Sequence, residues 1–224
     1  MDKISVGSLF DLEKTLAAKL FDGVGYPWEA LEGIPGFICE IGPELEKRGF
    51  KRTGENVWIA PDARVAPSAF INGPCIIDSG AEIRHCAFIR GKAIVGKGAV
   101  VGNSTELKNA LLFDGVQVPH FNYVGDSILG YKAHLGAGAV TSNVKNDKTD
   151  VSVKTDSGAI PTGRRKLGAM VGDMAQIGCN SVLNPGTVVG RGAMVYPLSC
   201  VRGVVPEYTV YKSGGIKVPL ESRG

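Results

Sequence analysis

The sequence predicts an all-β fold in which short parallel strands wind into a triangular β-helix. Large apolar residues recur at every sixth position, and a small residue follows most of them four positions later. A period of six matches neither a helix nor a flat strand, but it matches a solenoid in which each hexad is one strand and one turn. The large residues are Ile59, Val65, Ile71, Ile77, Ile83, Ile89, Val95, Val101, Leu107 and Phe113, then Val171, Ile177, Leu183, Val189, Val195 and Val201.

Three such hexads complete one coil, with the large residues inside and the small residues at the corners. The turns need positive φ, which the fourth place of the hexad supplies at Gly80, Gly98, Gly186, Gly192 and Asn180. Successive coils are expected to stack as parallel strands about 4.8 Å apart.

Residues 1–55 do not keep the period and are expected to be helical. Ser8 can cap a helix that carries Leu9, Leu12, Leu16 and Leu20 at helical spacing, and a second helix is predicted from Glu40 to Arg48. We interpret this segment as a cap or docking element at one end of the β-helix, where the first coil would leave its core open. A partner-binding arm is the alternative.

The β-helix is predicted over residues 56–210, with a tail at 211–224 and an interruption between them. After Phe113 the period slips, and over residues 141–166 it stops in an inserted basic loop. Such a loop emerges from one face of a solenoid and often shapes a binding site. Its charges are either a solvated hairpin or an anion site for a phosphate group; they are Lys145, Lys148, Lys154, Arg164, Arg165 and Lys166.

Composition sets limits on the class of protein. A net charge of +3 does not indicate binding to nucleic acid, and no apolar run approaches the length that spans a membrane. Asp2, Asp11 and Glu13 stand where a secretory signal would be apolar. The five cysteines are odd in number and lack C-x-x-C spacing, so we expect reduced thiols in a cytoplasmic protein.

Two strings carry more specific information than the hexads. They are P-H-x-x-Y-x-G-D at 119–126 and G-A-G-x-x-T-x-N at 136–143. With these strings, the stretch from Asn72 to Val205 resembles the C-terminal acetyltransferase domain of the bifunctional UDP-N-acetylglucosamine pyrophosphorylase / glucosamine-1-phosphate acetyltransferase. That resemblance implies that the coils wind left-handed and that the protein is a homotrimer.

The resemblance also implies a site. His120 would be the general base for attack of an amine on acetyl-CoA, since an imidazole changes protonation near neutral pH. Glu106, Lys108, Tyr123 and Asn143 would contact a sugar phosphate, and acetyl-CoA would lie near Ala137, Cys179 and Pro197. Backbone N–H groups of the turn at 136–138 are expected to hold the developing oxyanion. No nucleotidyltransferase domain precedes the β-helix in this sequence.

Three positions depart from the family's pattern and leave the acceptor open. Asp78 aligns with an arginine for the sugar phosphate, His134 with an asparagine, and Val144 with a tyrosine. We count His134 among the candidate substrate-binding residues, because it lies fourteen residues after His120.

Three functions are therefore weighed. The first is an acetyl-CoA-dependent acyltransferase that acts on an amino sugar or sugar phosphate, and the second is a non-catalytic sugar-nucleotide-binding or regulatory module. The third is a γ-class carbonic anhydrase, which needs two histidines five residues apart. His85, His120 and His134 offer no such pair, so no metal site is expected.

Overall fold

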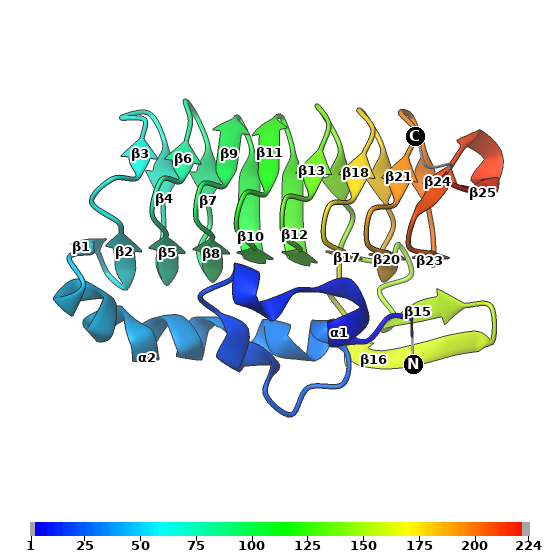
Figure 1. Ribbon diagram of the computed structural model, residues 1–224, viewed down its shortest axis with the longest axis horizontal. Helices are drawn as coiled ribbons and strands as arrows, with labels where there is room; N and C mark the ends of the chain where they lie inside the picture. Colours follow the sequence, from blue (N-terminus) through cyan, green and yellow to red (C-terminus); the bar gives the residue numbers. More distant parts are fainter. Residues whose placement is uncertain (1–2, 221–224) are drawn as a thin grey trace.

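The computed structural model describes residues 3–220 and confirms the predicted fold class, a left-handed parallel β-helix. Asp2 and the last four residues of the predicted tail lie outside this range. The β-helix has three faces, and its strands stack in parallel along the length of the molecule (Figure 1).

Each face has its own series of strands. The face we call the covered face holds β2 (Val57–Ile59), β5 (Cys75–Ile77), β8 (Ala93–Val95), β17 (Ala169–Val171), β20 (Thr187–Val189) and β23 (Val204–Val205). The second face holds β3 (Arg64–Val65), β6 (Glu82–Ile83), β9 (Val100–Asn103), β11 (Gln117–His120), β13 (His134–Leu135), β18 (Gln176–Ile177), β21 (Met194–Val195) and β24 (Thr209–Tyr211). The third, which we call the open face, holds β4 (Phe70–Ile71), β7 (Phe88–Ile89), β14 (Val140–Thr141), β19 (Val182–Leu183) and β22 (Cys200–Val201).

Two long strands bend from the open face onto the covered face. In β10 (Glu106–Leu112), residues 106–107 pair with β7 and residues 110–112 pair with β8. The next coil repeats the bend in β12 (Tyr123–Leu129), which pairs with β10 along its length. The six-residue period therefore slips after Phe113 in the region where β10 and β12 pass a corner of the β-helix as continuous strands, without a turn.

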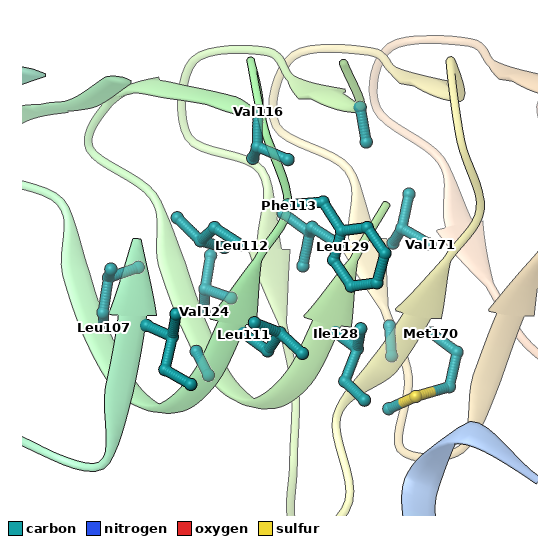
Figure 2. Packing of buried hydrophobic residues seen from close by; sticks show 14 of the residues in the cluster. Leu107, Leu111, Leu112, Phe113, Val116, Val124, Ile128, Leu129, Met170 and Val171 are labelled. Carbon is teal, nitrogen blue, oxygen red and sulfur yellow. The ribbon is translucent and has the colours of Figure 1, made fainter. Parts of the chain in front are cut away.

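The predicted interior residues fill the β-helix. Ile77, Val95, Leu107 and Val171 are buried completely, and Figure 2 shows Leu112, Leu129 and Val171 following one another from coil to coil. In the first coil Ile59, Val65 and Ile71 stay half-buried, because no earlier coil covers them. The predicted turn residues are also confirmed, since Gly80, Gly98, Gly186, Gly192 and Asn180 all have positive φ.

The first predicted helix is wrong. Only α1 (Val6–Leu9) is helical there, followed by the short 3₁₀ turns η1 (Leu12–Lys14) and η2 (Ala18–Phe21). The carbonyls of Leu9 and Lys14 accept hydrogen bonds from the backbone N–H groups of Asp173 and Asp114, at 3.0 Å each. Because these carbonyls bind the β-helix, they are not free to continue a helix of their own.

The second helix is longer than predicted. A 3₁₀ helix, η3 (Pro27–Glu32), leads into α2 (Ile34–Lys47), which starts six residues before Glu40. Pro35 stands in the first turn, where its missing N–H costs nothing, and so it begins the helix rather than preventing it.

The N-terminal segment was predicted to cap one end of the β-helix. It runs along the side of the β-helix instead. Figure 1 shows α2 lying lengthwise beneath the strands of the covered face. It contacts β2, β5, β8 and β10, and Gly42 approaches Trp58 so closely that a Cβ would lie 2.2 Å from the indole ring.

An unpredicted row of outward apolar residues explains this placement. The covered face is apolar on both sides, and its outward row is in register from coil to coil: Trp58, Ile76, Ile94, Leu111, Ile128, Met170 and Val188. Figure 2 shows Leu111, Ile128 and Met170 in this row. All seven side chains are buried, so the row needs a cover that an end cap would not supply.

The interruption and the tail both form antiparallel pairs. The inserted loop is a hairpin of β15 (Val151–Thr155) and β16 (Gly158–Arg164), and β15 contacts β20 and β23 at the corner of the β-helix. At the start, β1 (Lys51–Gly54) pairs with β2. Near the end, η4 (Ser213–Gly215) turns the chain back so that β25 (Lys217–Pro219) pairs with β24. The two pairs at the ends protect sheet edges.

Candidate functional site

Glu106, Lys108, Tyr123 and Asn143 come together on the open face. Glu106 and Tyr123 are register partners on β10 and β12, and Lys108 stands two residues further along β10. Asn143 follows β14, and its Nδ2 donates to the hydroxyl of Tyr123 at 3.2 Å. Four residues that are up to 37 positions apart in the sequence thus form one cluster, because successive coils stack them side by side on the open face.

Asp126 joins this cluster from below the surface. Its carboxylate accepts hydrogen bonds from Lys108 Nζ at 2.8 and 2.9 Å, from Asn143 Nδ2 at 2.5 Å and from Asn109 Nδ2 at 2.8 Å. The side chain of Asp126 is 5% exposed and that of Lys108 is 26% exposed. The sequence reasoning did not assign a role to Asp126, although it lies in the P-H-x-x-Y-x-G-D string.

An arginine also belongs to the cluster. Arg90 Nη1 lies 2.8 Å from Glu106 Oε1, and Arg90 precedes Lys108 by one 18-residue coil. Counting back one coil from Lys108 could have found it. Asp78, by contrast, lies at the corner between β5 and β6, beside Lys97, Asp114 and Asp62 rather than on the open face. The inference that Asp78 takes the place of an arginine in this cluster is therefore wrong.

Tyr123 sits in a crowded, negatively charged place. Partial burial raises the pKa of its hydroxyl, and the nearby carboxylates of Asp126 and Glu106 add to the rise. The phenol therefore stays protonated and can donate a hydrogen bond. Its ring folds over Gly125, where a Cβ would lie 2.4 Å from the Tyr123 oxygen, so a larger residue at that position would displace the ring.

His120 lies at the corner between the second face and the open face. It ends β11, its side chain is exposed, and Phe121 after it turns the corner with a φ of 52°. No hydrogen bond joins the imidazole to any residue from 3 to 220, so the ring is available to a ligand.

A buried asparagine fixes this corner. Asn122 is 2% exposed, and its Oδ1 accepts the backbone N–H of His120 at 3.1 Å. Its Nδ2 donates to the carbonyls of Gly136 and Ala139, at 2.8 and 3.0 Å. The next turn of the β-helix is thereby tied to His120. The sequence reasoning missed Asn122, whose only signal was a polar residue two positions after the histidine.

Ala137, Cys179 and Pro197 form a column above His120 at the same corner. The N–H of Gly138 donates to the carbonyl of His120 at 3.0 Å, that of Asn180 to Ala137 at 2.8 Å, and that of Leu198 to Cys179 at 2.9 Å. Cys179 and Pro197 are exposed and Ala137 is half-buried, so the column presents a continuous surface.

Only one N–H of the predicted oxyanion turn is free. The N–H groups of Gly136 and Gly138 already donate to the carbonyls of Ile177 and His120, at 2.7 and 3.0 Å. Within the described residues, the N–H of Ala137 has no acceptor. The expectation of a turn with several available donors is therefore corrected to a single donor.

His134 does not join the cluster within one chain. It lies on the second face, where it pairs in register with Gln117 and Gln176, and its Nδ1 lies 3.2 Å from Gln176 Oε1. A half-buried histidine bound to a glutamine is consistent with a structural role.

Residues 3–220 show neither a candidate metal site nor a candidate membrane span. No group of three histidine, cysteine, aspartate or glutamate side chains is placed to hold a metal ion within that range. No helix in the same range is long and apolar enough to cross a membrane. All five cysteines are free thiols.

The sequence comparisons agree with one another. The family described as the GMPPB C-terminal domain matches residues 71–157. The bifunctional protein GlmU of Methanococcus maripaludis is 32% identical over 197 residues, which cover 86% of this chain and 47% of that protein. YaiX of Escherichia coli K12, an uncharacterized acetyltransferase by its description, is 32% identical over 157 residues, covering 70% of this chain and 68% of YaiX. The chain spans about half or less of the length of the GlmU-like relatives.

Two solved structures are similar to this chain at low identity. The acetyltransferase domain of PglB from Neisseria gonorrhoeae, solved with acetyl coenzyme A, is 22% identical with a TM-score of 0.35, over 84% of this chain and 67% of that domain. A single-residue mutant of AntD, an N-acyltransferase from Bacillus cereus solved with dTDP and coenzyme A, is 20% identical with a TM-score of 0.38, over 81% of this chain and 89% of that one.

Proposed function

This chain belongs to the hexapeptide-repeat acetyltransferases that include YaiX and the C-terminal region of GlmU-like proteins, and we propose that it transfers the acetyl group of acetyl-CoA to an amino sugar or sugar phosphate. One observation carries the proposal. An unbonded, exposed imidazole at His120 stands between the column of Ala137, Cys179 and Pro197 and the polar cluster of the open face.

His120 is the general base in this proposal. The acceptor amine attacks the thioester carbonyl, a C–N bond forms, the C–S bond breaks, and CoA leaves as a thiolate. The amine must lose a proton during this step, and the imidazole accepts it and passes it to the thiolate. Asn122 holds the backbone of His120, so the ring starts from a fixed corner.

The N–H of Ala137 stabilises the oxyanion that develops on the thioester oxygen. It is the one donor of its turn that no protein carbonyl occupies among the described residues, and it lies one coil above His120. A fixed backbone donor aimed at developing charge is an effective arrangement for acyl transfer. Acetyl-CoA then extends along the column past Cys179 and Pro197.

The acceptor sugar lies on the open face. Lys108 and Arg90 offer positive charge to a phosphate, Glu106 and Tyr123 offer hydrogen bonds to hydroxyl or amine groups, and Asn143 fixes Tyr123. His134 would reach this site only from a neighbouring subunit. We propose a cytoplasmic homotrimer, in which the acetyl-CoA column lies between two subunits.

One observation favours the second candidate, a non-catalytic sugar-nucleotide-binding module. The charged groups of the cluster already have partners, since Lys108 binds Asp126 and Glu106 binds Arg90. A ligand must therefore compete with these pairs. The Arg90–Glu106 pair is partly exposed, so its exchange for a ligand costs little. If Lys108 turns to a ligand, the buried Asp126 keeps Asn109 and Asn143 as donors, and we prefer the enzyme.

The test is release of free CoA with a panel of amino sugars and sugar phosphates, for the wild type and His120→Ala. The substitution should lower kcat on the order of 100- to 10,000-fold for the true acceptor. His85→Ala is the matched control, because His85 is another exposed corner histidine, and it should leave kcat unchanged. Full turnover in His120→Ala would contradict the general base. Binding of a sugar nucleotide without CoA release from any acceptor would favour the non-catalytic module.

A further inference from the structure

Besides the polar cluster, a polar hollow lies at the edge of the open face opposite His120. It has a volume of about 370 Å³ and lies between the corner of the β-helix, the end of the hairpin and the N-terminal segment. The corner contributes Lys92, Asn109 and Asp126, the hairpin contributes residues 163–166, and the N-terminal segment contributes Glu32 among others. We call this hollow the hairpin pocket.

Positive charge in the hairpin pocket exceeds negative charge. Lys92, Arg164, Arg165 and Lys166 line it, against Asp126 and Glu32. Asp126 is already surrounded by Lys108, Asn109 and Asn143. Glu32 is 89% exposed and reaches only Arg164, at 3.8 Å. Within residues 3–220 no ion pair engages Lys92, Arg165 or Lys166, so three of the four cations of the pocket are not neutralised by a carboxylate.

One of the residues that line the pocket also has an unsatisfied buried donor. The Nε of Arg164 is buried and has no hydrogen-bond partner among the described residues. A buried N–H without an acceptor is costly, and such a group is often met by an unseen ion or ligand. Arginine and lysine together suit phosphate oxygens, with arginine binding in a planar fork.

The pocket and the polar cluster share a wall. Asp126 lines the pocket and also binds Lys108 and Asn143 of the cluster. His120 stands at the opposite edge of the open face. The two corners are marked by positive φ at Phe121 and Asp126, and the five residue steps between them span about 16 Å at the rise of a β-strand.

We propose that the hairpin pocket binds a diphosphate, and that this diphosphate belongs to the acceptor of the acetyl group. The inference rests on the proposed function, because it assumes that the reacting amine lies at His120. A hexose with one phosphate is shorter than the span between the two corners. A sugar that carries a nucleoside diphosphate can reach from His120 across Tyr123 to Lys92, Arg165 and Lys166.

The binding experiment uses inorganic pyrophosphate and the full chain in a calorimetric titration at low, constant ionic strength. Wild type should bind pyrophosphate, and the double variant Arg165→Gln/Lys166→Gln should bind it at least tenfold more weakly, because two charge-assisted contacts are lost. Lys92→Gln should weaken binding by a smaller factor. Lys148→Gln is the matched control, since it removes an exposed charge from the same inserted segment, and it should stay within twofold of wild type.

Two results would overturn the diphosphate site. One is no measurable binding of pyrophosphate by wild type, and the other is an equal loss in Lys148→Gln and in the double variant. Pyrophosphate binding that survives in His120→Ala would support the pocket even if turnover showed that His120 is not the base, so the two proposals fail separately.

The kinetic experiment identifies the source of the diphosphate. If the acceptor supplies it, the double variant should raise the KM for a nucleoside-diphosphate sugar on the order of tenfold, with the KM for acetyl-CoA unchanged. A rise confined to the KM for acetyl-CoA would assign the pocket to the diphosphate of CoA and overturn its assignment to the acceptor. An unchanged KM for both substrates would overturn it as well.

Discussion

The Oδ1 of Asn122 accepts the backbone N–H of His120 at 3.1 Å, while its Nδ2 donates to two carbonyls of the next coil. A single buried amide thus links the turn that carries the proposed base to the turn that carries the free N–H of Ala137. Together with the hydrogen bond from the N–H of Gly138 to the carbonyl of His120, this side chain fixes the relative position of the two groups.

Replacing Asn122 by alanine should destabilise the protein and slow the reaction. The substitution leaves the N–H of His120 and the carbonyl of Ala139 without partners, and it leaves the carbonyl of Gly136 with only the N–H of Ala139. This should cost about 2–4 kcal/mol in the free energy of unfolding. Urea denaturation gives that value. Because the His120 turn loses its support, kcat should fall more than KM rises.

Asn103→Ala is the control for this prediction. The Asn103 amide donates to the carbonyl of His85 at the same corner, but this hydrogen bond is exposed, so its loss should cost less than about 1 kcal/mol. Equal losses in the two variants would show that the buried link has no special importance.

Replacing Asp126 by alanine should weaken acceptor binding selectively. Lys108, Asn109 and Asn143 lose their common acceptor, and Asn143 no longer fixes Tyr123. We expect a rise in the KM for the acceptor with the KM for acetyl-CoA unchanged, and a loss of about 2 kcal/mol in stability. Asp147→Ala, an exposed carboxylate of the inserted segment, should change neither KM.

Replacing Asp78 by asparagine should stabilise the protein at neutral pH. Asp78 is 4% exposed, and burial raises the pKa of its carboxyl despite the hydrogen bond from the N–H of Ser79. Between the ordinary and the raised pKa the folded state holds a proton that the unfolded state has released. Stability contributed by Asp78 is therefore highest at low pH and falls as pH rises through this window.

The measurement is urea denaturation of wild type and Asp78→Asn from below the ordinary carboxyl pKa, about pH 3, to pH 7. The stability advantage of the variant should grow with pH and disappear below the ordinary carboxyl pKa. Asp62→Asn at the same corner is the control, because the hydroxyl of Ser79 lowers the pKa of Asp62 and its neutralisation should bring no gain. An advantage that does not change with pH would contradict the explanation.

Replacing Phe10 by alanine should loosen the N-terminal segment. The ring is 2% exposed and packs against Phe113 and Phe21, with centroids 5.1 and 6.1 Å away. Truncation of a buried phenylalanine costs about 3–5 kcal/mol, which thermal or urea unfolding would show. Phe10→Leu keeps most of the apolar volume and should recover at least half of that loss.

Much of the fold could be predicted because a hexad needs only its own six residues. Ile77 and Gly80 show this locally, since one fills the interior and the other turns the corner by positive φ. The N-terminal helix from Leu9 to Leu20 failed because hydrogen bonds to Asp173 and Asp114 replaced its own. Its signal was local, and the partners that overrode it lie more than 90 residues away.

The path of α2 was missed for a related reason, although a signal existed. Residues such as Ile76, Ile94 and Leu111 make the covered face apolar on both sides, and consecutive apolar residues at every coil could have indicated a covered sheet. The candidate site was partly accessible in the same way. Glu106, Lys108 and Tyr123 lie together as expected, whereas Arg90 and Asp126 needed the count of residues in each coil.

The sequence by itself determined the β-helix, its turns and the place of His120, because each of these depends on residues close together in the chain. Only the tertiary structure decided which side the N-terminal segment covers, which carboxylate gathers Lys108 and Asn143, and that Arg164–Lys166 return to Lys92. These are contacts between coils and between the β-helix and its insertions. They depend on how many residues each coil contains and on which apolar row remains to be buried. Neither can be read from a single hexad.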